Sequence, residues 1–390
     1  NVRFGVNAGN SIVSGGNYNV LVGDEAGTAI TTGDSNVFVG YQSGDATTTA
    51  DSNVGIGRGT LTTNILSDHN TAIGNGALFT HNQASSTDSY NTAVGSNAGA
   101  AVTTGVQNTL IGGLAGDAIT TANNNTALGY SALGLNTTGA GNTAIGRTAL
   151  ENNTTASDNV AVGRATLSQN TTGANNTAVG SLALLVNTTA SNNVAVGLST
   201  LQANTTGGQN VAVGASSLYT NTTGASNTAV GHQVLASNTT ASNNTGIGFE
   251  ALNANTTGRD NTALGFSAGV TNTTGLENTA IGMYALRFNT TGDTNTAVGL
   301  QALHRNTTAS SNTAVGRNAM EANTTGALNS ALGSSALANN TTGGNNVAMG
   351  FATMQLNTTA SNNVAIGYAA MNANTTGASN VAVGRSALGA

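Results

Sequence analysis

The chain of 390 residues contains no cysteine, no proline and no tryptophan, and only 6% of its residues are charged. Without cysteine, neither a disulfide nor a thiolate metal site can form. The net charge of −6 is spread thinly and there is no basic stripe, so nucleic acid is not an expected partner. No apolar run approaches the roughly 20 residues of a membrane span, so we expect no membrane insertion by this segment.

What the chain has instead is a repeated phrase, Asn-x-x-apolar-Gly, present in 23 copies that begin with Asn1 and end with the copy at Asn380. From Asn91 onward the spacing is always 17 residues, and a four-residue insertion separates Asn70 from Asn91. The consensus is N-(T/V)-A-(V/I)-G-x-x-A-L-x-x-N-T-T-(G/A)-x-x, numbered here as positions 1 to 17. A short fixed period of this kind predicts a solenoid in which each repeat forms one coil.

The residue types favour an all-β, parallel β-solenoid of 17-residue coils. Thr, Val and Ile at positions 2 and 4 favour a short strand, and we expect a second extended run at positions 12 to 14. Gly at position 5 and Gly or Ala at position 15 are expected at the corners, since Gly accepts a positive φ. Asn at position 1 should stack on itself as a hydrogen-bonded amide ladder. The ladder is predicted at Asn91, Asn108, Asn125, Asn142 and Asn159.

Strand alternation sets positions 2 and 4 on one face and position 3 on the other. We place the position-4 aliphatic and Leu of position 9 inside the coil, which directs the nearly invariant Ala of position 3 outward. Two large aliphatics per coil make a thin core, so several copies packed around an axis would bury this Ala face. The predicted interchain residues are Ala144, Ala161, Ala178 and Ala229.

The inner volume is expected to be filled from two positions. Where position 9 is Leu, position 12 is usually Asn, whereas Gly27 and Gly116 at position 9 accompany Ile30 and Ile119 at position 12.

The repeats divide the chain into three parts: variant repeats at 1–69, the repeat with the insertion at 70–90, and the regular array at 91–390. The insertion brings Phe79, His81 and Tyr90 into an otherwise uniform sequence. Loops on a rigid scaffold commonly carry recognition, so these three residues are a candidate recognition loop.

No constellation typical of an enzyme occurs, and we expect no catalytic, cofactor-binding or metal-binding residues. The Asn-Thr-Thr tripeptide is a glycosylation sequon in secretory proteins. We expect it to serve as a structural ladder instead.

The phrases NTAVG, NTAIG and NVAVG followed by x-x-A-L resemble the head repeats of YadA-like trimeric autotransporter adhesins. The longer form NTAVGxxALxxNTTG resembles repeats of bacterial surface fibres and phage tail fibres. This resemblance covers essentially the whole chain. It implies a left-handed β-roll of three intertwined chains, although a period of 17 is longer than in the usual adhesin heads.

The expected function is therefore a structural and adhesive shaft or head of an extracellular trimeric fibre. Its partners would be two further copies of itself and an unknown surface receptor or glycan, and its location a cell surface, a virion or an injection-system tail. The alternative is a monomeric β-solenoid that binds ice or polysaccharide through a flat Thr/Asn face.

Overall fold

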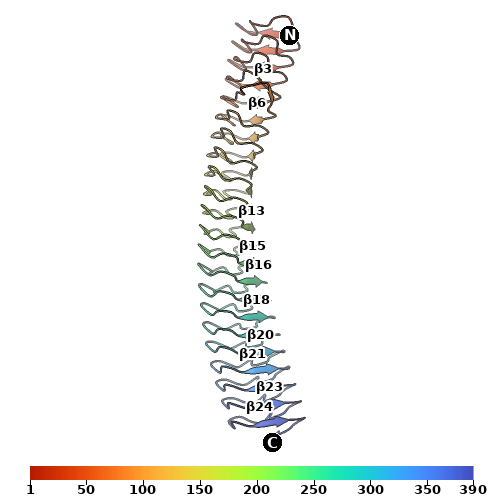
Figure 1. Ribbon diagram of the computed structural model, residues 1–390, viewed down its shortest axis with the longest axis vertical. Coiled ribbons are helices and arrows are strands. Elements are labelled where there is room, and N and C mark those ends of the chain that lie inside the picture. Colours follow the sequence, from red (N-terminus) through yellow and green to blue (C-terminus); the bar gives the residue numbers. More distant parts are fainter. Residues whose placement is uncertain (390) are drawn as a thin grey trace. The chain divides into compact units, whose positions relative to one another are not determined.

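The computed structural model describes residues 1–389, which divide into two compact units, one of residues 1–193 and one that begins at Val194. Within each unit the chain winds into successive coils, each of which contributes a three-residue strand to a parallel sheet (Figure 1). No helix occurs in the described part. Each unit is thus a parallel β-solenoid of 17-residue coils, as the sequence predicts.

The strands of the first unit are β1 (Val2–Phe4), β2 (Val20–Val22), β3 (Val37–Val39), β4 (Val54–Ile56), β5 (Ser67–Asp68), β6 (Thr71–Ile73), β7 (Thr87–Asp88), β8 (Thr92–Val94), β9 (Thr109–Ile111), β10 (Thr126–Leu128), β11 (Thr143–Ile145), β12 (Val160–Val162) and β13 (Thr177–Val179). Those of the second are β14 (Val194–Val196), β15 (Val211–Val213), β16 (Thr228–Val230), β17 (Thr245–Ile247), β18 (Thr262–Leu264), β19 (Thr279–Ile281), β20 (Thr296–Val298), β21 (Thr313–Val315), β22 (Ser330–Leu332), β23 (Val347–Met349), β24 (Val364–Ile366) and β25 (Val381–Val383).

The register keeps each repeat position stacked on itself. Ala144 pairs with Ala161 in the first unit, and Ala212 pairs with Ala229 in the second. The insertion is absorbed outside the strand, because Ala72 still pairs with Ala93 across a 21-residue step. Every position therefore forms a column along its unit, and identical side chains lie above one another.

The glycine of position 5 is required by the backbone. Its φ lies between +122° and +141° in all 23 copies, a region that residues with a side chain rarely adopt. A β-carbon on Gly129 would also lie 2.6 Å from the carbonyl oxygen of Gly146 in the next coil. The glycines of position 15 do not share this conformation in the regular array, so the prediction of a positive φ there is wrong. At Gly105 and Gly173 the constraint is instead the close approach of the next coil's carbonyl.

The asparagines of position 1 form the predicted ladder, and they are buried. The Oδ1 of Asn91 accepts hydrogen bonds from the backbone N–H of Asn108 (3.0 Å) and from its Nδ2 (3.2 Å). The same Nδ2 donates to the carbonyl oxygen of Ala122 at 2.9 Å, which fastens the two ends of the coil to each other. These bonds satisfy polar groups that would each cost about 1–3 kcal/mol if they were buried unpaired.

A second amide ladder runs through position 12. The Nδ2 of Asn153 donates to Asn136 Oδ1 (2.8 Å) and to the carbonyl oxygen of Ala156 (2.9 Å), and Asn136 is wholly buried. The expected second strand at positions 12 to 14 is not formed, although backbone bonds such as Thr137 N–H to Thr154 O (2.8 Å) still join successive coils there.

The inward and outward faces of the strand are the reverse of the prediction. Ala144, Ala161, Ala178 and Ala229 are 0% exposed and point into the coil, whereas the aliphatics of position 4 point outward. The physical reason is space, because position 3 shares the interior with position 9. Where position 3 is large, position 9 must be Gly. A β-carbon on Gly116 would lie 2.8 Å from Leu110 Cδ2 and 2.7 Å from Ile119 Cδ1.

Candidate functional sites

The most extended candidate surface is the strand face, defined here as the side chains at positions 2 and 4 of every coil. Position 4 is apolar in all 23 copies, and position 2 is Val, Thr or Ser, so the face carries no charge. Leu264 and Leu332, both at position 4, are 45% and 48% exposed. Each unit therefore presents a continuous apolar column that the unit itself does not cover.

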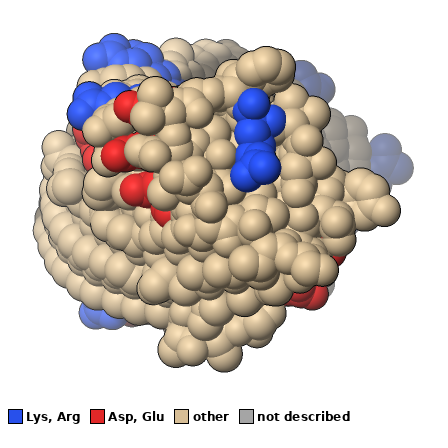
Figure 2. All heavy atoms as spheres, turned by 90° about the horizontal axis from the view of Figure 1, so that it is seen from above, with Lys and Arg blue, Asp and Glu red and all other residues tan. Residues whose placement is uncertain are grey.

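Charge is sparse on the rest of the surface as well. On the face drawn in Figure 2, acidic and basic side chains form short rows and isolated spots among uncharged residues. Three acidic side chains of position 16 stack in consecutive coils, and their carboxylates accept backbone hydrogen bonds: Asp51 Oδ1 from Asp34 N–H, and Asp68 Oδ1 from Asp51 N–H. These acids therefore link each coil to the next one.

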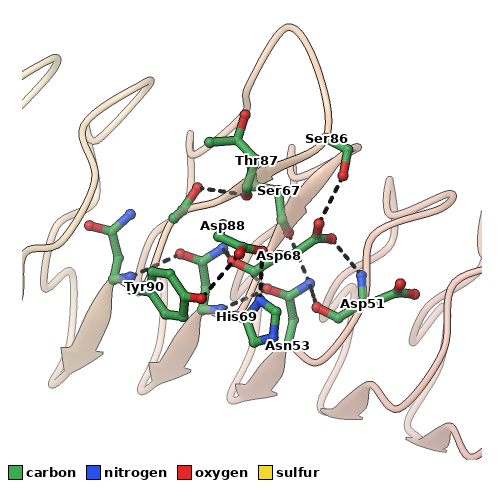
Figure 3. Close-up of polar contacts among 12 residues, drawn as sticks. Asp51, Asn53, Ser67, Asp68, His69, Ser86, Thr87, Asp88 and Tyr90 are labelled. Carbon is green, nitrogen blue, oxygen red and sulfur yellow. Dashed lines mark hydrogen bonds and ion pairs between the residues drawn. The ribbon is translucent and has the colours of Figure 1, made fainter.

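The insertion coil carries a network of polar side chains (Figure 3). Strand β7 pairs in parallel with β5, which sets Asp88 beside Asp68. His69 Nδ1 lies 3.0 Å from Asp88 Oδ1, and the Tyr90 hydroxyl donates to Asp88 Oδ2 at 3.1 Å. The rings of His69 and Tyr90 stack at 5.2 Å between centroids, and Ser86 Oγ donates to Asp68 Oδ2 at 2.9 Å. These contacts hold the inserted segment against the coil before it.

His81 was expected in an exposed recognition loop, and this prediction is wrong because the side chain is 0% exposed. It occupies position 12, the column of the second amide ladder, between the coils of Asn64 and Val102. Within the described residues, neither ring nitrogen makes a hydrogen bond of normal geometry. Burial lowers the pKa of His81 to about 4, and the backbone of Thr103 offsets this only in part. The imidazole is therefore neutral at physiological pH.

Phe79 and Tyr90 are 44% and 52% exposed, but they do not belong to one site. Tyr90 packs on His69, whereas Phe79, at position 10, lines a groove formed by other coils. The three residues of the predicted loop therefore lie in three different places: His81 in the core, Tyr90 in the polar network and Phe79 in the groove.

The groove has a volume of about 430 Å³ and lies within the first unit. Its centre is formed by Gly59 and Gly76, which occupy position 7 in two consecutive coils. Every other copy has a side chain there. The lining residues are Gln42, Arg58, Gly59, Asn75, Gly76, Phe79, Asn97 and Ala100. Sequence reasoning missed this groove, although the consecutive glycines at position 7 were a readable signal.

The second unit has an aromatic column at position 6. His232 stacks on Phe249 at 5.4 Å between centroids, and Phe249 stacks on Phe266 at 5.2 Å, with interplanar angles of 10° and 8°. In the next coil position 6 is Met283, and Tyr284 of position 7 meets Phe266 edge-on at 5.4 Å between centroids. Since the rings of the stack face one another, mainly their edges meet solvent.

Among residues 1–389, no group of three or more His, Asp or Glu side chains is placed to hold a metal ion. The same residues include no helix long and apolar enough to cross a membrane. Comparison with family models, with curated proteins and with solved structures found no match to this chain. The class of the protein is therefore defined by its own geometry: it is a β-solenoid repeat protein with 17-residue coils.

Proposed function

We propose that this chain is a non-enzymatic structural segment of an extracellular fibre, in which three copies pack their strand faces together around a common axis. The carrier would be a bacterial surface adhesin, a virion or an injection-system tail. The observation that carries the proposal is the uncharged strand face. An apolar, exposed or half-buried side chain at the outward position 4 of all 23 coils is unusual for a solvent-facing sheet, which normally alternates apolar and polar faces.

The coil interior supports the same role. The Asn ladder of position 1 ties each coil to its neighbours, a second ladder joins it from Asn136 onward, and backbone bonds link successive coils at many positions, so stiffness accumulates coil by coil. Such a segment suits a spacer that holds binding groups away from a surface. Positions 6, 7, 10, 11, 16 and 17 vary between copies and would present the contacts for a receptor or glycan, strengthened by avidity across chains.

The alternative, a monomer that binds ice or polysaccharide through a Thr/Asn face, has less support. The Asn of position 12 is buried, and Thr137 Oγ1 of position 13 donates to the carbonyl oxygen of Thr154 at 3.0 Å. In every Asn-Thr-Thr copy from Thr137 to Thr359 only the second threonine is exposed, so one hydroxyl per coil is placed to meet a ligand.

The test is the solution mass, measured by light scattering on a size-exclusion column. Three chain masses, each of 38.1 kDa, are expected for the wild-type chain. Glu at position 4 of three consecutive coils (Ile281→Glu, Val298→Glu and Val315→Glu) should yield a folded monomer, because stacked charges cannot be buried between chains.

The matched control adds the same three charges to the same three coils at position 17, where the side chains are exposed: Thr294→Glu, Ser311→Glu and Leu328→Glu. Glu277 already occupies this position in a neighbouring coil. The control should remain trimeric. A wild-type mass of one chain, or equal dissociation of both variants, would overturn the proposed assembly.

A further inference from the structure

We propose that the groove centred on Gly59 and Gly76 is a binding site for an acidic saccharide, a pyranose that carries a carboxylate. The site lies within the first unit, at positions 6, 7 and 10. It is separate from the strand face, and the inference does not depend on the oligomeric state.

The hollow is specific to two coils. Position 7 adopts a left-handed conformation throughout the array, with φ of +54° at Gln42, +63° at Gly59, +67° at Gly76 and +56° at Asn97. Side chains are therefore tolerated at this position, and the coils on both sides of the groove have them. The two glycines remove two adjacent side chains from one column, and this creates a depression with Gln42 at one end and Asn97 at the other.

The lining offers an unpaired cation. The guanidinium of Arg58 makes no hydrogen bond or ion pair with any described residue, and the residue is exposed at the groove. A free guanidinium has five donors in a planar fork that matches a carboxylate in a bidentate manner. Among residues 1–389, the one acid whose side chain is bonded to the groove lining is Glu25, and its Oε2 accepts a hydrogen bond of 2.8 Å from Gln42 Nε2.

The remaining lining suits a sugar ring. The side-chain amides of Asn75 and Asn97 make no hydrogen bonds with the described residues, so each can donate to one hydroxyl and accept from another. Phe79 is 44% exposed, and its Cε2 lies 3.5 Å from the point that a β-carbon of Gly59 would occupy. This ring forms an apolar wall against which the C–H face of a pyranose can pack.

The size agrees with this ligand class. A volume of about 430 Å³ falls within the roughly 300–1,000 Å³ range of small-molecule sites. One cation, two amides and one aromatic ring are a small number of converging polar groups beside an apolar surface, as specific ligand sites require.

The experiment measures binding of D-glucuronate and of D-glucose, two probes that share a ring and differ in the carboxylate, by saturation-transfer NMR titration of the full chain. Wild-type protein should bind glucuronate at least about tenfold more tightly than glucose. Arg58→Gln should remove this preference, and Phe79→Ala should weaken binding of both sugars about tenfold.

Two further variants separate a built site from general charge attraction. Gly59→Asn refills the hollow with the residue type that Asn97 has at the same position, and it should abolish binding while Arg58 stays in place. Arg164→Gln removes an exposed arginine from position 6 of a coil without the glycine pair, and binding should be unchanged. No binding by the wild type, equal binding of both sugars, or undiminished binding by Gly59→Asn would each overturn the proposal.

Discussion

The Oδ1 atom of Asn142 accepts two hydrogen bonds from Asn159 of the next coil, one from the backbone N–H at 3.0 Å and one from Nδ2 at 3.3 Å. The Nδ2 of Asn142 donates in turn to the carbonyl oxygen of Ala156 at 2.9 Å. One buried amide thus satisfies groups in two coils. No other side chain of this size provides both an acceptor and a donor with this geometry.

Asn142→Ala should therefore destabilise the first unit by roughly 1–3 kcal/mol, because it leaves the buried backbone N–H of Asn159 without its acceptor. The carbonyl oxygen of Ala156 keeps its hydrogen bond from Asn153 Nδ2. The measurement is the shift of the urea denaturation midpoint. Asn152→Ala is the control, since that side chain makes no hydrogen bond with the described residues and its loss should change stability by less than about 0.5 kcal/mol. Equal shifts of the midpoint for the two variants would show that the Asn ladder does not contribute to stability.

The burial of His81 predicts that stability decreases in mild acid. The unfolded imidazole binds a proton near pH 6.5, whereas the folded one does so only near pH 4. Between these values the unfolded state binds more protons, so the free energy of unfolding rises with pH and falls as the solution is acidified. The full loss, reached below about pH 4, is on the order of 3 kcal/mol.

His81→Asn isolates this contribution. An amide at position 12 can donate to Asn64 Oδ1 as Asn153 does to Asn136, so the variant should be at least as stable as wild type at pH 7 and clearly more stable at pH 4.5. The measurement is the urea midpoint at several pH values, compared between the two proteins. The comparison uses the difference in stability between the two proteins at each pH. Burial also lowers the pKa of His304, and its contribution to the pH dependence is the same in both proteins and cancels. Parallel pH profiles would contradict the assignment to His81.

Leu110 and Gly116 should show strong energetic coupling, because their side chains compete for one space. Gly116→Leu should destabilise the chain through its clash with Leu110, although its φ of +55° is close to that of the leucines at the same position in other coils. Adding Leu110→Ala, the usual residue of position 3, should recover part of the loss. A double-mutant cycle should give a favourable coupling of about 2 kcal/mol, whereas additive effects would contradict the shared volume.

Ala229→Glu should prevent folding of its coils rather than merely separate chains, since a carboxylate would be buried between Ala212 and Gly246. Circular dichroism should show loss of β-structure at every protein concentration. Ser226→Glu, three residues earlier on an exposed turn, should leave the spectrum unchanged. If Ala229→Glu were instead folded but monomeric, the Ala of position 3 would have to face outward and contact other chains, contrary to the buried position described above.

The sequence predicts the period, the parallel register and the Asn ladder because these follow from residues that recur without exception. The alternation of side chains by itself does not tell which face of the strand is inside. Alternation places the side chains of positions 2 and 4 on one face of the strand and that of position 3 on the other. Both Ala and Val are apolar, so the pattern is compatible with either face being buried. The deciding signal was the covariation between position 3 and position 9, seen in Phe38 with Gly44 and in Leu110 with Gly116.

The candidate sites were harder to predict, because they arise from exceptions. His81 looks like a loop residue beside an insertion, yet its place in the 17-residue count assigns it to a buried column. The groove exists because two consecutive coils have Gly instead of a side chain at position 7. That these glycines form a hollow follows only from the structure, which places Gln42 and Asn97 at its two ends.

The registration of both ladders at 17 residues has a consequence for how such a gene changes. Every coil in the regular array bonds to the coils immediately before and after it through the same atoms, as Asn108 does with Asn91 and Asn125. Duplication or loss of one whole repeat by unequal recombination would thus recreate a junction already present. The number of repeats can therefore change between lineages without any new kind of contact between coils. An insertion of any other length has to form a loop outside the strand, as the four residues inserted between Asn70 and Asn91 do.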